Sequence, residues 1–441
     1  MSNITAKVVE KKYIIPFILL TSLFFLWGIA NDLTNPMVSA FKKVMPELSN
    51  MEAALVQLAF YGGYATMAIP AALFIRKFSY KSGILLGLAL YATGALLFIP
   101  AAKLEIFSFF LASLYILTFG LAFLETTSNP YVLSMGASET ATRRLNLAQT
   151  FNPLGSLLGM LGAQILVIKA LTSDDYTAEA YQALSSAEQA TIRTNDLGII
   201  STPYIALGVF VLVMLVLIAI VKMPKKSEDH DALNIFDTFK TLFKNKRYYE
   251  GVITQMFYVA AQIMCWTFIY QYVDNLNANR PADAQLTATW YNMAAMIAFL
   301  VGRSAGTMLL KYFRPGQLMF VFALTGIGFT FGAIFIPGIV GLYSLVGISV
   351  AMSIMFPTIY GIALKDMGDE AKLGSAGLVM AIVGGALMPP IQGRILDIAG
   401  PGFADTTILG VPEVNFSFIL PLMCLVVVAV YSYRAEKVHL K

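Results

Sequence analysis

Long apolar segments separated by short polar ones follow one another along the whole chain. Each apolar segment has about the 20 residues that an α-helix needs to cross the hydrocarbon core of a bilayer, or more. The pattern predicts about twelve membrane-spanning helices, over residues 13–41, 51–76, 81–101, 105–134, 144–171, 200–222, 248–275, 286–310, 316–337, 339–364, 373–397 and 413–434. Outer-membrane β-barrels show short alternating segments instead, so the fold class predicted is an all-α membrane protein.

The composition agrees with this interpretation. Hydrophobic residues make up 58% of the 441 residues and charged residues 13%, whereas charged residues are about 25% of an average soluble domain. The first apolar segment is too long for the core of a cleavable signal peptide and has no small-residue cleavage site. Cys265 and Cys424 both lie in apolar segments, which argues against a structural disulfide and a cysteine metal site. We expect no cofactor and no resident metal.

Lysine and arginine residues concentrate in the loops on one side of the predicted helices. By the positive-inside rule this side is cytoplasmic, and an even number of helices then places both termini in the cytoplasm. The opposite side carries only Lys42, Lys43, Lys103, Lys169, Arg193 and Arg280. The pattern predicts a multi-pass protein of the bacterial inner (plasma) membrane. The net charge of +4 reflects this topology and does not indicate a nucleic-acid partner.

Two long polar segments interrupt the series of helices. Residues 172–199 are acidic and are expected to form an outer loop, and residues 223–247 carry mixed charge near the middle of the chain. Short basic turns recur at matching places, FIRKFSYKSG after the second helix and LLKYFRPGQL after the eighth. These features predict two six-helix halves, 1–222 and 248–441, joined by a cytoplasmic linker over 223–247. Parallel halves of this kind are one known transporter architecture.

Two carboxylates interrupt the apolar segments, Asp32 in FFLWGIANDLTNPMV and Glu125 in LYILTFGLAFLETTSNPYVLSM. A charged side chain at the centre of a bilayer costs about 2.5–3.5 kcal/mol on insertion scales, so such residues are functional by default. His230 and His439 both lie in polar segments, so a proton carrier inside the membrane must be a carboxylate. No cation lies near Glu125 in the sequence, and burial without a cation favours a neutral carboxyl group. Glu125 is therefore a candidate proton carrier; alternatively, it joins two helices by hydrogen bonds.

Asp32 has polar neighbours on the first predicted helix. Asn31, Asp32 and Asn35 share one broad helical face, and Pro36 removes the amide that would bond the carbonyl of Asp32. The carbonyl and the carboxylate together suit a proton or a cation. Alternatively, the neighbouring amides hold Asp32 and Pro36 only kinks the helix.

Further amides, hydroxyls and one indole recur at helical spacing within the apolar segments. The candidates for binding a polar solute are Gln57, Tyr61, Asn129, Gln149, Asn152, Gln262, Trp266 and Asn292. Trp266 beside Gln262 suits a sugar, because the ring of a sugar stacks on an aromatic face while its hydroxyls meet an amide. Pro153 frees the carbonyl of Gln149 as Pro36 frees that of Asp32.

Each of these positions also has a structural interpretation. Gln57 and Tyr61 suit an interfacial belt, the amides suit hydrogen bonds between helices, and Trp266 suits core packing. Arg303, in FLVGRSAG, is expected to bond backbone carbonyls at a helix end and not a substrate.

Seven motifs extend from the first to the eleventh predicted helix: SLFFLWGIANDLTNP, LETTSNPY, RLNLAQTFNPLGS, AAQIMCW, FLVGRSAG, MSIMFPTIY and VGGALMPPIQG. Together they resemble the fucose–galactose–glucose proton symporters of the major facilitator superfamily. The resemblance implies a twelve-helix fold that imports a hexose or deoxyhexose (L-fucose, glucose or galactose class) with protons by alternating access. It also implies that Glu125 takes part in protonation and sugar binding. Asn31, Gln149 and Asn152 match polar positions of the family.

One position departs from the family pattern. A helix-one aspartate implicated in proton coupling aligns with Asn35, whereas this chain has Asp32 about one turn earlier on the same face. A sodium ion held by Asp32, Asn35 and freed carbonyls is an alternative, because oxygen ligands suit hard cations. The resemblance does not decide which sugar is transported, since VGGALMPPIQG looks more like the glucose and galactose branch of the family.

The sequence also bears on other classes of protein. It has no intramembrane histidine, HExxH motif, serine–histidine pair or P-loop, so we predict a carrier and not an enzyme. The expected partners are a small sugar, a proton or sodium ion and the lipid bilayer, with the chain acting as a monomer. A sodium-coupled symporter and an uncoupled uniporter or sensor are the alternatives.

Overall fold

The computed structural model describes residues 7–34, 37–45, 48, 50–176, 180–181, 183–223, 235–278, 280–368, 370–396 and 407–439. Twelve helices in these ranges are long and apolar enough to cross a membrane. The predicted all-α fold with about twelve spans is confirmed. The only strands in the described ranges, β1 (Thr407–Ile408) and β2 (Val411–Pro412), form a short antiparallel hairpin that pairs Thr407 with Pro412.

The chain divides into two compact units. The C-terminal unit contains Met1–Lys11, Val132–Pro153 and His230–Lys441, and the N-terminal unit contains Lys12–Tyr131 and Leu154–Asp229. The segment Val132–Pro153 therefore groups with the helices of the C-terminal unit. The division predicted from the sequence, with halves 1–222 and 248–441 and a linker over 223–247, stays a prediction.

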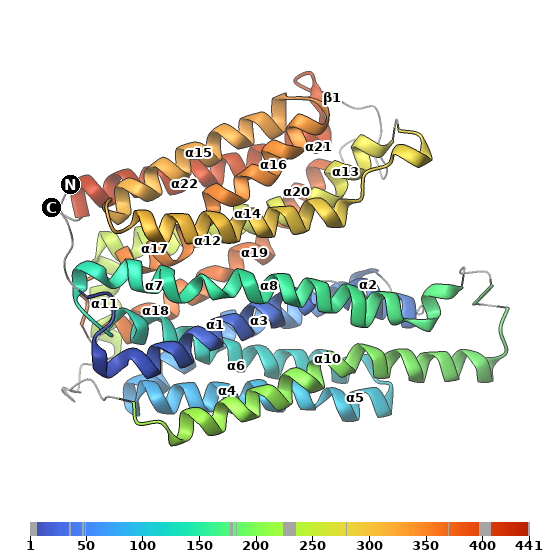
Figure 1. Cartoon of the computed structure of the whole chain (residues 1–441), viewed down its shortest axis with the longest axis horizontal. Helices are drawn as coiled ribbons and strands as arrows, with labels where there is room; N and C mark the ends of the chain where they lie inside the picture. The colour runs from blue at the N-terminus through green and yellow to red at the C-terminus, as the bar shows by residue number, and fades with distance from the viewer. Residues whose placement is uncertain are drawn as a thin grey trace. The chain divides into compact units, whose positions relative to one another are not determined.

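Helices α1 to α6, α8 and α10 belong wholly or mostly to the N-terminal unit (Figure 1). Their bounds are α1 (Ile14–Thr34), α2 (Met37–Val44), α3 (Asn50–Lys77), α4 (Tyr80–Leu96), α5 (Phe98–Leu104), α6 (Phe107–Leu133), α8 (Phe151–Gly162) and α10 (Ser186–Ile220). A π-helical turn (Ala163–Val167) and 3-10 turns (Ile168–Ala170 and Thr172–Asp175) continue α8. Helices α1 and α2 both fall in the helix predicted over 13–41, and the two residues between them, Asn35 and Pro36, lie outside the described residues.

Glycines let helices of the N-terminal unit pack with their backbones close together. A Cβ added at Gly94 of α4 would lie 2.2 Å from the Leu117 nitrogen of α6, and one at Gly155 of α8 would lie 1.9 Å from the Phe25 oxygen of α1. Small residues at such crossings allow the tight packing that holds helices together in lipid.

The start of α10 corrects one prediction. The polar loop expected over 172–199 is wrong from Ser186 onward, because α10 begins there and not at residue 200. Ser185 and Glu188 form a capping box, with the Glu188 carboxylate 2.9 Å from the Ser185 amide nitrogen. The buried Asp196 accepts bonds from the amides of Thr172 (2.8 Å) and Ser173 (2.9 Å). Capping and anchoring keep these polar turns helical, and hydropathy does not report either of them.

The C-terminal unit holds the remaining helices. They are α7 (Ala141–Gln149), α11 (Ile235–Lys244), α12 (Lys246–Thr267), α13 (Ile269–Asn277), α14 (Ala288–Leu309), α15 (Pro315–Phe335), α16 (Gly338–Met352), α17 (Met355–Ala363), α18 (Glu370–Met380), α19 (Gly384–Leu387), α20 (Pro389–Leu396), α21 (Glu413–Ser417) and α22 (Ile419–Arg434). Short 3-10 turns (Lys11–Tyr13, Ser138–Thr140, Ala282–Ala284 and Ala381–Val383) and a final π-helical turn (Ala435–His439) complete the described elements.

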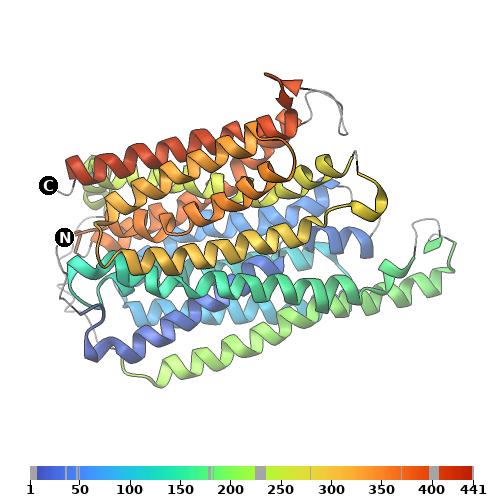
Figure 2. The same cartoon turned by 45° about the horizontal axis from the view of Figure 1, so that its top comes forward.

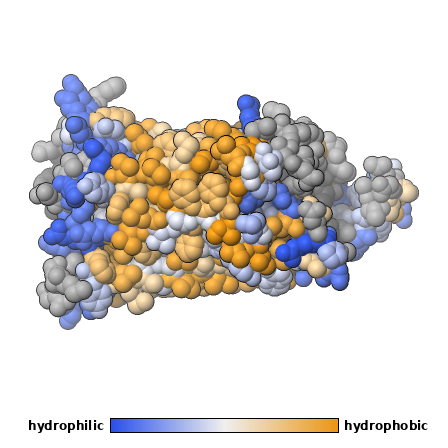
Figure 3. All heavy atoms as spheres, turned by 90° about the horizontal axis from the view of Figure 1, so that it is seen from above, coloured by the Kyte–Doolittle hydropathy of each residue, from blue (hydrophilic) through white to orange (hydrophobic). Residues whose placement is uncertain are grey.

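Helix α15 packs along both α16 and α22 in this unit, as Figures 1 and 2 show. The outward sides of these helices are apolar: Val321 and Phe335 of α15, Tyr343 of α16 and Val430 of α22 are all exposed. Apolar residues form a broad band on the face shown in Figure 3, and hydrophilic residues gather at its edges. This is the surface that a helix bundle presents to lipid tails.

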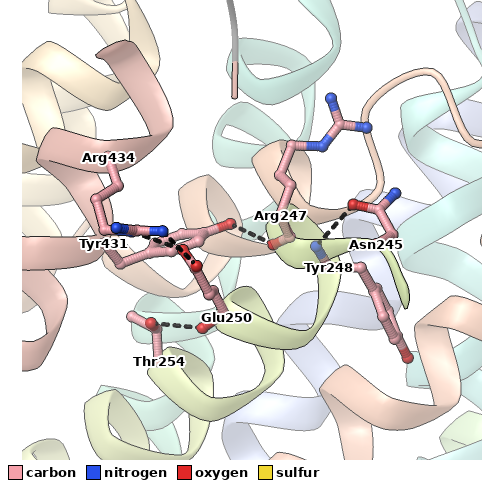
Figure 4. A network of polar contacts seen from close by, with 7 residues as sticks. All are labelled: Asn245, Arg247, Tyr248, Glu250, Thr254, Tyr431 and Arg434. Carbon is pink, nitrogen blue, oxygen red and sulfur yellow. Dashed lines mark hydrogen bonds and ion pairs between the residues drawn. The ribbon is translucent and has the colours of Figure 1, made fainter. Parts of the chain in front are cut away.

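A polar network holds the first turns of α12 to the end of α22 (Figure 4). Glu250 accepts two hydrogen bonds from Arg434, from Nη2 at 2.7 Å and Nε at 3.1 Å, and the Tyr431 hydroxyl donates to the Arg247 carbonyl at 3.3 Å. The bidentate geometry makes this a stronger contact than a typical surface ion pair. It ties together two segments that the sequence analysis assigned to the cytoplasmic side; that orientation stays a prediction.

Candidate functional site

The two predicted carboxylates both lie in the N-terminal unit, and each lies near a tyrosine of α3. Asp32, buried on α1, lies within electrostatic range of Tyr61, and Glu125, half-buried on α6, lies within range of Tyr64. Tyr61 and Tyr64 are one turn apart on α3. One helix therefore carries two phenol groups that lie within electrostatic range of acids on two different helices.

Glu125 lies in apolar surroundings on α6. Within the described ranges it forms no ion pair with a lysine or arginine. Asn129 lies one turn further along α6 and is fully buried, and the next residue, Pro130, has no N–H to donate within the helix. A carboxyl group in these surroundings is most stable when it carries a proton, which makes Glu125 suited to taking up and releasing one.

The polar face of the first helix is only partly described. Asn31 is half-buried, and its Oδ1 atom is buried with no hydrogen-bond partner among the described residues. Thr34 shares a 3.0 Å hydrogen bond with the Tyr204 hydroxyl and donates to the Ala30 carbonyl. Asn35 and the side chain of Gln57 lie outside the described residues. The sodium site suggested at Asp32 and Asn35 therefore stays a prediction. No group of three or more histidine, cysteine or acidic residues in the described ranges suits a metal ion.

The amides Gln149 and Asn152 lie on either side of a break in the helical hydrogen bonding of one membrane span, Ser138–Ala170; the backbone at Thr150 stays helical there. Helix α7 ends at Gln149 and α8 begins at Phe151, and Pro153 follows in the first turn of α8. Gln149 is buried and Asn152 is half-buried. The two amides are three residues apart in the sequence, but each belongs to a different helical segment.

Trp266 and Asn292, predicted separately, are brought together in the C-terminal unit. The Asn292 amide of α14 donates to the Trp266 carbonyl of α12 at 3.4 Å, and the Trp266 indole donates to Ser349 of α16 at 3.1 Å. The indole also meets the Phe299 ring edge to face, with ring centroids 5.2 Å apart. Gln262, one turn before Trp266, is half-buried. These contacts fix the orientation of the Trp266 ring while its N–H is already satisfied.

Gln255 and Tyr258 share a face of α12 with Gln262 by helical spacing, but they were not among the sugar-binding residues predicted from the sequence. Gln255 and Tyr258 are fully buried, and both amide atoms of Gln255 and the Tyr258 hydroxyl have no hydrogen-bond partner among the described residues. Their helical spacing with Gln262 was visible in the sequence. Only burial distinguishes them as polar groups that need a partner.

Arg303 is buried on α14 and bonds backbone carbonyls. It is 3% exposed and donates from Nε to the Ser353 carbonyl at 2.5 Å and from Nη1 to the Gln149 carbonyl at 3.0 Å. Its guanidinium group lies 4.6 Å from the centroid of the Phe299 ring. The prediction that Arg303 bonds backbone carbonyls is confirmed.

Comparison with known proteins adds to this geometry. The family model described as Major Facilitator Superfamily matches residues 16–389. The chain belongs to the Major Facilitator Superfamily. Within this superfamily it is 55% identical, over 98% of its length and 99% of the relative, to the L-fucose-proton symporter of Haemophilus influenzae. It is 34% identical to the L-fucose-proton symporter of Escherichia coli K12, over 97% of this chain and 94% of that protein.

A further relative and a solved structure extend the comparison. A glucose/galactose transporter of Brucella abortus is 30% identical, over 97% of this chain and 96% of that protein. A crystal structure of the E. coli fucose:proton symporter superposes with a TM-score of 0.84 at 32% identity, covering 96% of this chain and 99% of that chain. All these relatives are named for transport. With twelve candidate spans, membership of the superfamily makes the chain a multi-pass protein of the bacterial inner membrane.

Proposed function

We propose that the protein is a secondary active symporter that imports a sugar of the hexose or deoxyhexose class together with protons by alternating access. L-fucose is the first candidate for this sugar. The observation that carries this proposal is the 55% identity, over nearly the whole chain, to a relative named as an L-fucose-proton symporter. The structure supports it through Glu125, an acid in the apolar N-terminal unit without a cation among the described residues. A carrier of this kind needs a group that can be protonated within the membrane.

The residues have separate roles in this proposal. Glu125 takes up the proton and bonds sugar hydroxyls, and Asp32 is a second titrating or cation-binding group. The polar residues proposed to bind sugar are Asn31, Asn35, Gln57, Tyr61, Asn129, Gln149, Asn152, Gln262, Trp266 and Asn292. A membrane potential of 100 mV contributes about 2.3 kcal/mol for each charge moved, which is enough for roughly fifty-fold accumulation with one proton per sugar.

The coupling ion and the sugar define the competing hypotheses. The position of Asp32 favours sodium coupling. Asp32 lies about one helical turn before Asn35, the position at which the resemblance places the coupling aspartate. Glucose or galactose transport is favoured by the relatives at 30% identity that carry that name. An uncoupled uniporter or sensor would bind sugar without moving an ion. We also propose that the chain acts as a monomer.

Purified protein in proteoliposomes tests these hypotheses together. Uptake of L-fucose, D-glucose and D-galactose is measured with an inward proton gradient or an inward sodium gradient imposed separately. We expect L-fucose to accumulate above equilibrium with the proton gradient alone. Accumulation driven only by sodium would replace the proton as the coupling ion, and uptake that never exceeds equilibrium would contradict symport.

A further inference from the structure

Two prolines leave two backbone carbonyls without their helical donors in the C-terminal unit. Pro153 has no N–H to bond the carbonyl of Gln149, and Pro357 has none to bond the carbonyl of Ser353. Each carbonyl lies at a helix break, the first where α7 gives way to α8 and the second where α16 gives way to α17. Inside a membrane a carbonyl without a donor is costly, so each requires another partner.

Arg303 supplies both partners. Its Nε donates to the Ser353 carbonyl and its Nη1 to the Gln149 carbonyl, at 2.5 and 3.0 Å. No carboxylate in the described ranges pairs with this buried guanidinium. The two freed carbonyls and the Phe299 face are thus what stabilises its charge. Only a guanidinium offers two rigidly spaced donors for two carbonyls of different helices.

The helix that carries Gln149 is held by the same neighbours at other points. The Asn146 amide of α7 donates to the Thr358 hydroxyl of α17 at 3.2 Å. Gly361 of α17 faces Thr142 of α7, where an added Cβ would lie 2.6 Å from the threonine Oγ1. Helix α7 therefore packs closely on α17 up to its last turn, and Arg303 makes the final contact, at the break itself.

We propose that Arg303 is a positioning residue for sugar binding. By bonding the Gln149 carbonyl, to which Pro153 cannot donate, it sets the geometry of the break between α7 and α8. It thereby orients the Gln149 and Asn152 side chains on either side of that break. This inference rests on the proposed function, in which both amides bind sugar; Arg303 itself does not contact sugar.

The test compares Arg303→Met in three backgrounds. Equilibrium binding of L-fucose is measured for Arg303→Met in the parent, in Pro153→Ala and in Pro357→Ala, with thermal unfolding to confirm folding. Pro153→Ala restores an N–H that can bond the Gln149 carbonyl within the helix, and Pro357→Ala does the same for Ser353. Arg314→Met is the control, because Arg314 is exposed and pairs with Glu436.

We expect Arg303→Met to raise the Kd for L-fucose about tenfold in the parent and in Pro357→Ala, the size of one lost charge-assisted bond. In Pro153→Ala the same change should have less than about a twofold effect, because the carbonyl already has a donor. A tenfold effect in all three backgrounds, or no effect in the parent, would overturn the proposal. If Arg303→Met does not fold, Arg303→Lys replaces it, since one ammonium group cannot span both carbonyls.

Hydrogen exchange without sugar separates this proposal from the proposed function. Amides of residues 147–152 should exchange about tenfold faster in Arg303→Met than in the parent, because the break loses its anchor. Unchanged exchange would overturn the role of Arg303. Faster amide exchange in Arg303→Met would support the role of Arg303 at the break even if the parent protein bound none of the three sugars. The absence of sugar binding would then contradict the proposed function alone.

Discussion

At the scale of single residues, the environment of Glu125 decides what its carboxyl group can do. Glu125 is half-buried on α6, near Tyr64 and without a cation among the described residues. Desolvation therefore disfavours its charge, and no lysine or arginine of the described residues offsets that cost. Arg303 shows the opposite solution, because carbonyl oxygens and an aromatic face surround its charge. One group is suited to losing and gaining its charge, and the other to keeping it.

This contrast predicts the behaviour of Glu125→Gln. Glutamine resembles the protonated acid, so we expect sugar exchange to persist and accumulation driven by a proton gradient to be lost. In the parent, sugar affinity should fall as the pH rises, because the neutral form binds sugar; in Glu125→Gln, affinity should not depend on pH. Counterflow and gradient-driven uptake in proteoliposomes measure both properties.

Asp32→Asn is the companion variant, and the exposed Asp283→Asn is the control. We expect Asp32→Asn to reduce accumulation and Asp283→Asn to leave it unchanged. If Glu125→Gln and Asp32→Asn both accumulate sugar as the parent does, coupling through these carboxylates is contradicted.

At the scale of elements, close contacts between helices depend on where glycine replaces a side chain. Gly155 and Gly162 both lie on α8, but a Cβ at Gly155 would meet the Phe25 carbonyl at 1.9 Å, whereas one at Gly162 meets nothing within 4 Å. The spacing of glycines in GSLLGMLGA was visible in the sequence, but it did not show which glycine faces another helix. That assignment depends on how α1 and α8 cross.

We therefore predict different outcomes for the same substitution at these two positions. Gly155→Ala should lower the free energy of unfolding by about 1–3 kcal/mol, because α1 and α8 must move apart. Gly162→Ala should be neutral or stabilising by up to about 1 kcal/mol, since alanine favours helix over glycine. Thermal unfolding in detergent compares the two variants. Equal destabilisation would show that close packing against α1 is not the cause.

At the scale of the whole molecule, hydropathy accounts for the number of spans and the surface that faces lipid. Exposed apolar side chains such as Val321 and Val430 are expected where a membrane protein contacts the hydrocarbon core of the bilayer and not water. The orientation in the membrane depends on a different property, the distribution of lysine and arginine among the loops. The predicted cytoplasmic location of both termini follows from that distribution.

Fusion reporters test this orientation. A reporter that is active only in the cytoplasm should be active when fused to either end of the chain. The same reporter inserted near Arg193, on the predicted outer side, should be inactive. Activity at only one terminus would mean that the orientation or the parity of the spans is wrong.

The sequence by itself determined the fold class, the number of spans and the presence of two acids in apolar helices. These properties follow from hydropathy and from the cost of a charge in lipid, which act on each segment separately. Its prediction for residues 172–199 failed from Ser186 onward because hydropathy does not report capping: the Ser185–Glu188 pair and Asp196 keep polar turns helical. The sequence motifs also placed Gln149 and Asn152 beside a proline, as the structure describes them.

Only the tertiary structure decided which polar groups meet. Arg303 lies 154 residues from Gln149, and no spacing rule joins an arginine on α14 to carbonyls freed by prolines on two other segments. Gln255 and Tyr258 likewise became apparent only through packing, which buries polar atoms that have no partner in the described part of the chain. The physical reason is that hydrogen bonds between side chain and backbone depend on distances of a few ångströms between distant segments, whereas the hydrophobic pattern is local.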